Sequence, residues 1–169
     1  WHREQFHPTV IAITGSCGKT TTRSMLQSIL SVNHSVLATE GNYNNHIGVP
    51  LMLLRLNAEH AYAVFELGAS AIGEIADLAS WVQPAVSLIT QAGYAHIEGF
   101  GNLENVAKAK GEIYSALPTS GCAIINADDH FAGYWRGLLT LQKILTFSRN
   151  HAAEVYATDV RVNKGLSFC

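Results

Sequence analysis

The residues with the clearest chemical potential lie near the start of the chain, in a glycine-containing segment that a lysine and three threonines follow. Glycines let backbone N–H groups turn toward a phosphate, a lysine reaches terminal phosphates, and the next hydroxyl ligates Mg²⁺. The segment therefore predicts a loop that binds the phosphates of a nucleotide, formed by Gly15, Ser16, Cys17, Gly18, Lys19, Thr20 and Thr21.

The spacing of this loop departs from the general phosphate-loop pattern, which has a further glycine five positions before Gly18. That position is Ile13, so the sequence predicts a shortened variant of the loop. The alternative is a plain strand-to-helix turn that happens to contain Gly-Lys-Thr. An apolar run precedes the loop and a helical periodicity follows it, and both flanks favour the phosphate loop.

Two polar residues beyond the loop are candidate metal ligands. Glu66 ends an apolar run typical of a buried strand, where its carboxylate could bind Mg²⁺ beside Thr20. His96 lies in a loop that follows the next predicted strand and could bind a metal through its imidazole. The plainer alternatives are a structural acid at Glu66 and a solvated histidine at His96.

Lys110 is unusual because it falls on the apolar side of a predicted helix, whereas Lys108 falls on the opposite side. Burial lowers the pKa of a lysine and favours the neutral amine, which can act as a nucleophile or take up carbon dioxide as a carbamate. The alternative is a lysine whose stem follows the apolar stripe and whose ammonium reaches water. The stripe consists of Leu103, Val106, Ile113 and Leu117.

Two segments rich in amides are candidate ligand contacts. The first spans 40–50, and its Asn42, Asn44 and Asn45 predict a polar substrate contact. The second begins at Asn126, after a predicted strand, and could lie near the base or ribose of a nucleotide. A turn-rich connection is the alternative for the first segment, and a helix cap is the alternative for the second.

Strand-like and helix-like segments alternate along the chain, which predicts an α/β fold with a doubly wound, mostly parallel sheet. The last patterns, at 154–162 and 166–168, predict a small hairpin at the edge of the sheet. We expect strands over 10–14, 35–39, 61–67, 85–90, 122–126 and 144–147. We expect helices over 20–30, 51–56 with Pro50 as first residue, 72–81, 102–117 with Asn102 as cap, and 129–139.

Length and composition set further limits. The chain has 169 residues, enough for one α/β domain. Its net charge of −2 and its lack of a basic cluster argue against nucleic acid as a partner. No apolar stretch has the length that spans a bilayer. Cys17, Cys122 and Cys169 lack metal-ligand spacing and predict free thiols in a reducing cytoplasm.

Taken together, six motifs resemble the central ATPase domain of the Mur ligases, and most closely its MurF branch. The resemblance covers about 10–129, and its most specific parts are the asparagine-rich segment and the Glu-Gly-Phe-Gly loop. The motifs begin at Thr14, Gly41, Glu66, Gly73, His96 and Ala107.

The resemblance implies an ATP-dependent ligase of peptidoglycan synthesis that joins D-alanyl-D-alanine to UDP-N-acetylmuramoyl-tripeptide through an acyl phosphate. It implies that Lys19 stabilises the transferring phosphoryl group and that Thr20 and Glu66 hold one Mg²⁺. It further implies that His96 and a carbamylated Lys110 hold a second Mg²⁺. Because the family also has an N-terminal UDP-substrate domain and a C-terminal domain, we expect 1–169 to be a truncated central domain, inactive alone.

Two other functions remain alternatives. The first is another ligase of the same superfamily, similar to folylpolyglutamate synthase, although the asparagine-rich segment argues against it. The second is a non-catalytic nucleotide-binding module. A guanine-specific switch is disfavoured, because the Asn163-Lys164 pair lacks the aspartate of the usual guanine-reading motif.

Overall fold

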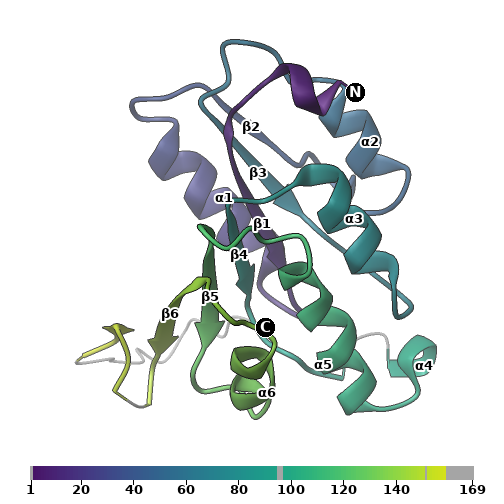
Figure 1. Ribbon diagram of the computed structural model, residues 1–169, viewed down its shortest axis with the longest axis vertical. Coiled ribbons are helices and arrows are strands. Elements are labelled where there is room, and N and C mark those ends of the chain that lie inside the picture. Colours follow the sequence, from purple (N-terminus) through teal and green to yellow (C-terminus); the bar gives the residue numbers. More distant parts are fainter. Residues whose placement is uncertain (1, 95–96, 151, 159–169) are drawn as a thin grey trace, which may run out of the picture.

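A seven-stranded sheet forms the centre of the protein, in a computed structural model that describes residues 2–94, 97–150 and 152–158 (Figure 1). The strand order is β2-β3-β1-β4-β5-β6-β7, and each neighbouring pair is parallel. The predicted α/β fold with a doubly wound parallel sheet is therefore confirmed. The strands are β1 (Thr9–Thr14), β2 (Val36–Ala38), β3 (Tyr62–Glu66), β4 (Val86–Ile89), β5 (Cys122–Asn126), β6 (Lys143–Ser148) and β7 (Val155–Tyr156).

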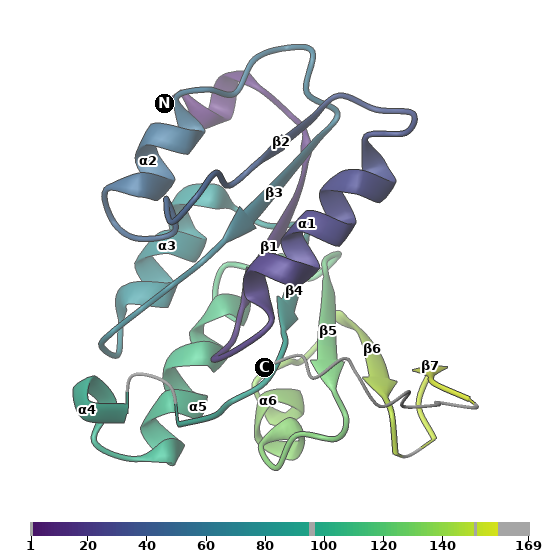
Figure 2. The ribbon, with the colours of Figure 1, turned by 180° about the vertical axis from the view of Figure 1, so that it is seen from behind.

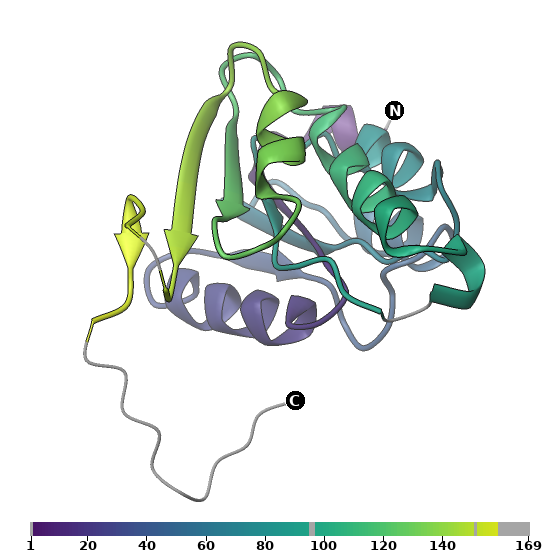
Figure 3. The same ribbon diagram turned by 90° about the horizontal axis from the view of Figure 1, so that it is seen from below.

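Helices cover both faces of the sheet. Helix α1 packs on one face through Leu26 and Leu30, which contact the cluster around Ile13 and Val64. The opposite face carries α2, α3, α5 and α6, whose apolar residues join the larger core (Figures 2 and 3). The helices are α1 (Lys19–Leu30), α2 (Gly48–Leu53), α3 (Glu74–Val82), α4 (Ile97–Phe100), α5 (Leu103–Gly111) and α6 (Ala132–Gly137), with single 3-10 turns η1 (Arg3–Gln5) and η2 (Glu112–Tyr114).

The path of the chain determines where a ligand would bind. Strand β1 pairs with β3 on one side and with β4 on the other. The chain therefore winds away from β1 in both directions, which leaves a crevice beyond the carboxyl end of β1. Ligands of doubly wound proteins bind at such a switch point, and the predicted phosphate loop begins there.

Several helix boundaries differ from the sequence prediction: α1 begins at Lys19 and not at 20, α2 ends at Leu53 and not at 56, α3 spans Glu74–Val82 and not 72–81, and α6 spans Ala132–Gly137 and not 129–139. Helix α2 begins at Gly48, two residues before Pro50, because Asn45 caps its first turn: the Asn45 side-chain oxygen accepts from the N–H of Gly48 at 2.9 Å. Helix α5 begins after Asn102 as expected, and the Asn102 side chain accepts from the Asn105 N–H at 2.7 Å. However, α5 ends at Gly111 and continues as η2, so the predicted helix to 117 is too long.

The C-terminal edge of the sheet is described only in part. The expected first hairpin strand appears as the two-residue β7, which runs parallel to β6. The segment 166–168, the expected second strand, lies outside the described residues, so the hairpin stays a prediction. Among the described residues, no helix combines the length and apolar character needed to cross a membrane.

Candidate active site

The loop between β1 and α1 has the backbone that a phosphate site requires. Gly15 and Gly18 have φ values of +146° and +84°, which L side chains rarely adopt. A Cβ on Gly15 would lie 1.8 Å from the Thr90 hydroxyl oxygen, so only glycine fits there. The same hydroxyl donates to the Cys17 carbonyl at 2.6 Å, which ties the loop to the end of β4.

Ser16 makes a second connection between the loop and the strand end. Its hydroxyl donates to the Gly93 carbonyl at 3.0 Å and accepts from the Gly93 N–H at 2.8 Å. The Ser16 N–H donates to the Gln91 carbonyl at 2.9 Å. The residues after β4 therefore hold the loop in shape from the side away from β3.

The cationic end of the site is Lys19, the first residue of α1. Its ammonium folds back over the loop and donates to the Gly15 carbonyl at 2.8 Å. Gly18 is the N-cap of α1, and because it has no side chain, no capping hydrogen bond occupies the N–H groups of the first turn. A lysine, backbone N–H groups and a helix N-terminus together attract an anion such as a polyphosphate.

Glu66 lies opposite the loop at the end of β3 and is only 3% exposed. One carboxylate oxygen accepts from the Thr20 hydroxyl at 2.9 Å, and the other accepts from the Asn44 amide at 3.0 Å. Its backbone N–H donates to the Thr39 hydroxyl at 2.9 Å. Thr20 and Glu66 therefore lie together, and their binding of Mg²⁺ stays a prediction.

The asparagines of the 40–50 segment lie in different places. Asn44 holds Glu66, and its carbonyl accepts from the Gly68 N–H at 2.8 Å. Asn45 lines the same cavity as Lys19 while it caps α2. Asn42 is exposed and does not line that cavity. Contact of any of the three with substrate stays a prediction.

Lys110 is buried, with 3% of its surface exposed, as its place on the apolar stripe predicts. Its ammonium lies 5.7 Å from the centre of the Phe100 ring. Burial lowers the pKa of Lys110 from its ordinary 10.5 to about 8, and the positive charge of Lys19 acts in the same direction. The carboxylates of Glu112 and Glu74 oppose that shift.

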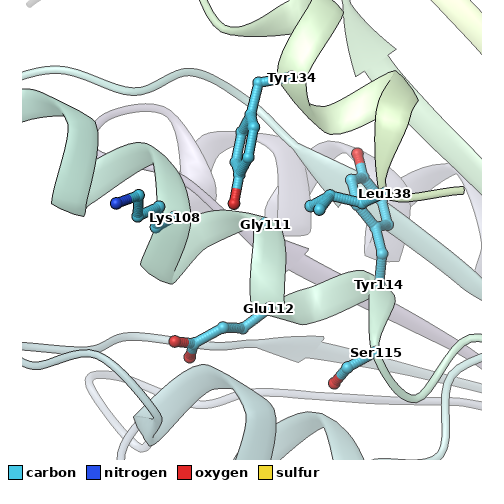
Figure 4. Close-up of a pocket in the computed structure, with 7 residues that line it drawn as sticks. All are labelled: Lys108, Gly111, Glu112, Tyr114, Ser115, Tyr134 and Leu138. Carbon is cyan, nitrogen blue, oxygen red and sulfur yellow. The ribbon is translucent and has the colours of Figure 1, made fainter.

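The neighbouring Lys108 is exposed, as expected for the opposite side of α5. It lines a separate cavity of about 240 Å³ with Tyr134 and Leu138 of the α6 region (Figure 4). Gly111 lines the same cavity, and a Cβ there would lie 2.8 Å from a Leu138 methyl carbon. The absence of a side chain at Gly111 thus lets the α6 region pack closely against the end of α5.

A cavity of about 280 Å³ joins the cationic and amide residues. Lys19, Lys110, Asn44 and Asn45 line it. Five further residues that were not predicted as site residues complete the lining: His46, Gly68, Ala69, Ser70 and Glu74. The Glu74 carboxylate accepts from the N–H groups of Ser70 and Ala71 at 2.7 and 3.2 Å, which fixes its orientation.

Asn126 does not line this cavity. The Asn126 amide donates to the Thr90 carbonyl at 2.9 Å, and its oxygen accepts from the Asp128 N–H at 3.0 Å. Asn126 is therefore linked to the loop through Thr90, and its contact with a base stays a prediction. His96 lies outside the described residues.

The donor set beside the loop fits a Mg²⁺ ion. Mg²⁺ prefers hard oxygen ligands and is commonly held by one or two carboxylates, waters and substrate phosphates. The Glu66 carboxylate and the Thr20 hydroxyl supply such oxygens next to the phosphate loop. The described residues contain no group of three or more His, Cys, Asp or Glu that could hold a metal by themselves.

Comparison with known proteins bears directly on this site, because residues 13–168 match the Mur ligase middle domain. The chain belongs to the Mur ligase family. The matched region includes Gly15 to Thr21, Glu66 and Lys110.

Individual relatives agree with that family. UDP-N-acetylmuramoyl-tripeptide–D-alanyl-D-alanine ligase of Escherichia coli K12 is 47% identical, over 96% of this chain and 36% of the relative. A structure of the UDP-N-acetylmuramoylalanyl-D-glutamyl-2,6-diaminopimelate–D-alanyl-D-alanyl ligase of Acinetobacter baumannii has a TM-score of 0.88 and 44% identity, over 95% of this chain and 35% of that one. MurF from Thermotoga maritima, solved in complex with ADP, has a TM-score of 0.81 and 32% identity, over 89% of this chain and 35% of that one. This Mur ligase chain thus spans about a third of the length of these relatives.

Cys17 provides a chemical probe of the phosphate loop in this Mur ligase. Cys17 is a free cysteine and is exposed to solvent. We expect a thiol reagent to modify Cys17 and saturating Mg²⁺-ATP to slow that modification at least tenfold, because the bound phosphates would cover the loop. Peptide mass spectrometry measures the rate, and Cys17→Ser identifies the labelled site. Equal rates with and without nucleotide would contradict a nucleotide at this loop.

Asn44 is expected to act on Mg²⁺ through Glu66. Removal of the amide in Asn44→Ala leaves one Glu66 oxygen without its donor, and loss of a group that orients a metal ligand weakens metal affinity about 10–100-fold. The Mg²⁺ concentration for half-maximal activity of the full-length Mur ligase should rise accordingly. Asn33→Ala, an exposed change in the turn after α1, serves as control. An unchanged Mg²⁺ dependence in Asn44→Ala would exclude this role.

Proposed function

We propose that this chain is the central ATP-binding domain of an ATP-dependent ligase that joins D-alanyl-D-alanine to UDP-N-acetylmuramoyl-tripeptide in peptidoglycan synthesis. The observation that carries the proposal is the single cavity that unites the phosphate-loop Lys19 with buried Lys110 and Asn44, the partner of Glu66. The names of the relatives supply the substrates, and the ADP in the Thermotoga structure supports ATP as the nucleotide.

In the proposed reaction, a carboxylate oxygen of the tripeptide attacks the γ-phosphorus of ATP and ADP leaves. The amine of the dipeptide then attacks the acyl carbon, the carbon–oxygen bond to phosphate breaks, and the nitrogen loses a proton. Lys19 and the loop N–H groups would stabilise the charge on the transferring phosphoryl oxygens. Thr20 and Glu66 would bind a Mg²⁺ that neutralises phosphate charge.

Lys110 has the chemistry for the second metal site. Its lowered pKa raises the fraction of neutral amine, which is the form that adds carbon dioxide. The resulting carbamate would be an anionic oxygen ligand beside Lys19. We propose that this carbamate and His96 hold a second Mg²⁺, as the family resemblance implies.

The extent and location of the whole enzyme belong to the same proposal. The relatives are about three times as long as the matched region, which supports an additional UDP-substrate domain and a C-terminal domain in the complete enzyme. Residues 1–169 alone would then be catalytically inactive. The soluble substrates expected for this reaction favour a cytoplasmic location.

Product formation by the full-length enzyme tests the proposed function. ADP release should require Mg²⁺, the UDP-linked tripeptide and D-alanyl-D-alanine together, and the product should contain a new amide bond by mass spectrometry. A folate substrate with glutamate tests the folylpolyglutamate synthase-like alternative. ADP release with folate but not with the tripeptide would overturn the proposal, and so would binding of nucleotide without turnover of either substrate.

A further inference from the structure

A second cavity of about 200 Å³ extends the candidate active site along α3. It shares Asn45, His46, Gly68 and Glu74 with the cavity that contains Lys19 and Lys110. The two cavities are therefore adjacent parts of one groove. The groove extends from Lys19 to Trp81 on α3. Helix α3 lies beside α2 (Figures 1 and 2).

One side of α3 lines the far part of this groove. Glu74, Asp77, Leu78 and Trp81 are spaced at i, i+3, i+4 and i+7, so they face the same direction. Leu78 is buried, Asp77 is exposed, and Trp81 is 39% exposed. The seven-residue separation corresponds to a rise of about 10 Å along the helix.

The two ends of the groove have opposite charge. Lys19 and Lys110 lie at the near end, where an anion would bind, Asp77 lies at the far end, and Glu74 lines both parts. Backbone N–H groups already occupy one Glu74 oxygen, whereas within the described residues no cation pairs with Asp77. A ligand that complements both ends carries a carboxylate at one end and an ammonium at the other.

We propose that this groove binds the terminal diamino acid of the acyl-donor peptide, with Asp77 recognising its distal ammonium and Trp81 contacting its methylenes. The proposal rests on the proposed function and makes Asp77 a residue that determines substrate specificity. The printed name of the Acinetobacter relative includes 2,6-diaminopimelate, whose second amine has the required charge. An aromatic ring beside an ammonium adds further attraction.

The incoming dipeptide also has an amine, but it fits the far end less well. An amine must be uncharged and close to the acyl carbon when it attacks. Carboxylates that hold it as an ammonium, away from the phosphate loop, would oppose both requirements. The distal amine of the donor peptide stays charged throughout the reaction and lies away from the reacting carboxylate, so it matches the groove.

Two donor peptides and two variants test this assignment in the full-length enzyme. The peptides are identical except that the distal amine of diaminopimelate is free in one and acetylated in the other. The ratio of kcat/KM for the free-amine peptide to that for the acetylated peptide measures recognition of the ammonium. We expect this ratio to fall about tenfold in Asp77→Asn, because a charge-assisted hydrogen bond is lost. KM for D-alanyl-D-alanine should not change.

Glu59→Gln removes an equal charge from an exposed turn outside the groove and should leave the ratio unchanged. Turnover with an unaltered ratio in Asp77→Asn would overturn the assignment of the groove and leave the proposed function intact. A rise confined to KM for the dipeptide would overturn it in favour of dipeptide binding. Absence of ADP release by the parent enzyme with either donor would overturn the proposed function itself.

Discussion

Replacement of Lys110 by methionine is expected to abolish ligation and, at neutral pH, to make the protein more stable. The loss of turnover should be about a thousandfold, because the buried amine and the carbamate proposed to form on it would no longer act beside the transferring phosphoryl group. The gain in stability follows from the burial of Lys110, whose charged form is costly in this apolar position.

The size of the stability effect depends on pH. The pKa of Lys110 is about 8 in the folded protein and 10.5 ordinarily, so the unfolded chain binds the extra proton between these values. Stability therefore increases as pH rises from 8 to about 10.5, and the penalty is fully present below 8. Methionine removes this penalty, which is up to about 3 kcal/mol.

Two measurements check the Lys110 prediction. Chemical denaturation of the parent and of Lys110→Met at pH 7 and pH 10.5 should show a stability difference that nearly disappears at the higher pH. ADP release by the full-length enzyme gives the turnover of each. Lys108→Met is the matched control, because Lys108 is exposed on the other side of α5. Parental turnover in Lys110→Met would exclude a catalytic role for the amine.

The second large effect is expected for Lys19→Ala. The Lys19 ammonium is the charge placed over the phosphate loop, where it donates to the Gly15 carbonyl at 2.8 Å. Its removal should reduce turnover at least a hundredfold and weaken Mg²⁺-ATP binding, because the phosphate charge loses its nearest cation.

Calorimetric titration with Mg²⁺-ATP measures binding, and ADP release measures turnover. Lys143→Ala removes an equal charge from the exposed start of β6, far from the loop in sequence, and serves as control. Equal nucleotide affinity and equal turnover in Lys19→Ala and the parent would show that the nucleotide binds elsewhere.

Local patterns were sufficient for the parts of the site that depend on one element. The strand, glycine loop and helix around Lys19 follow each other directly in the sequence, and the stripe on α5 predicted that Lys110 is buried. The end of an apolar run was also enough to place Glu66 at the carboxyl end of β3.

Other parts depend on contacts between distant segments, which a single sequence does not reveal. Thr39 holds the Glu66 backbone from the end of β2, and Thr90 holds the phosphate loop from the end of β4. Glu74 enters the site because backbone N–H groups four and three residues earlier orient it. The early start of α2 likewise depends on the Asn45 side chain, so Pro50 is the third residue of the helix and not the first, which proline usually favours.

The origin of the oxygen atoms in the released phosphate tests the central claim most directly. The full-length enzyme would be supplied with Mg²⁺-ATP, D-alanyl-D-alanine and a UDP-linked tripeptide labelled with oxygen-18 in the carboxylate that becomes the amide. If the site phosphorylates that carboxylate, each released phosphate carries one labelled oxygen and the second label stays in the amide. Unlabelled phosphate formed together with the amide product would contradict an acyl phosphate and the mechanism built on this site.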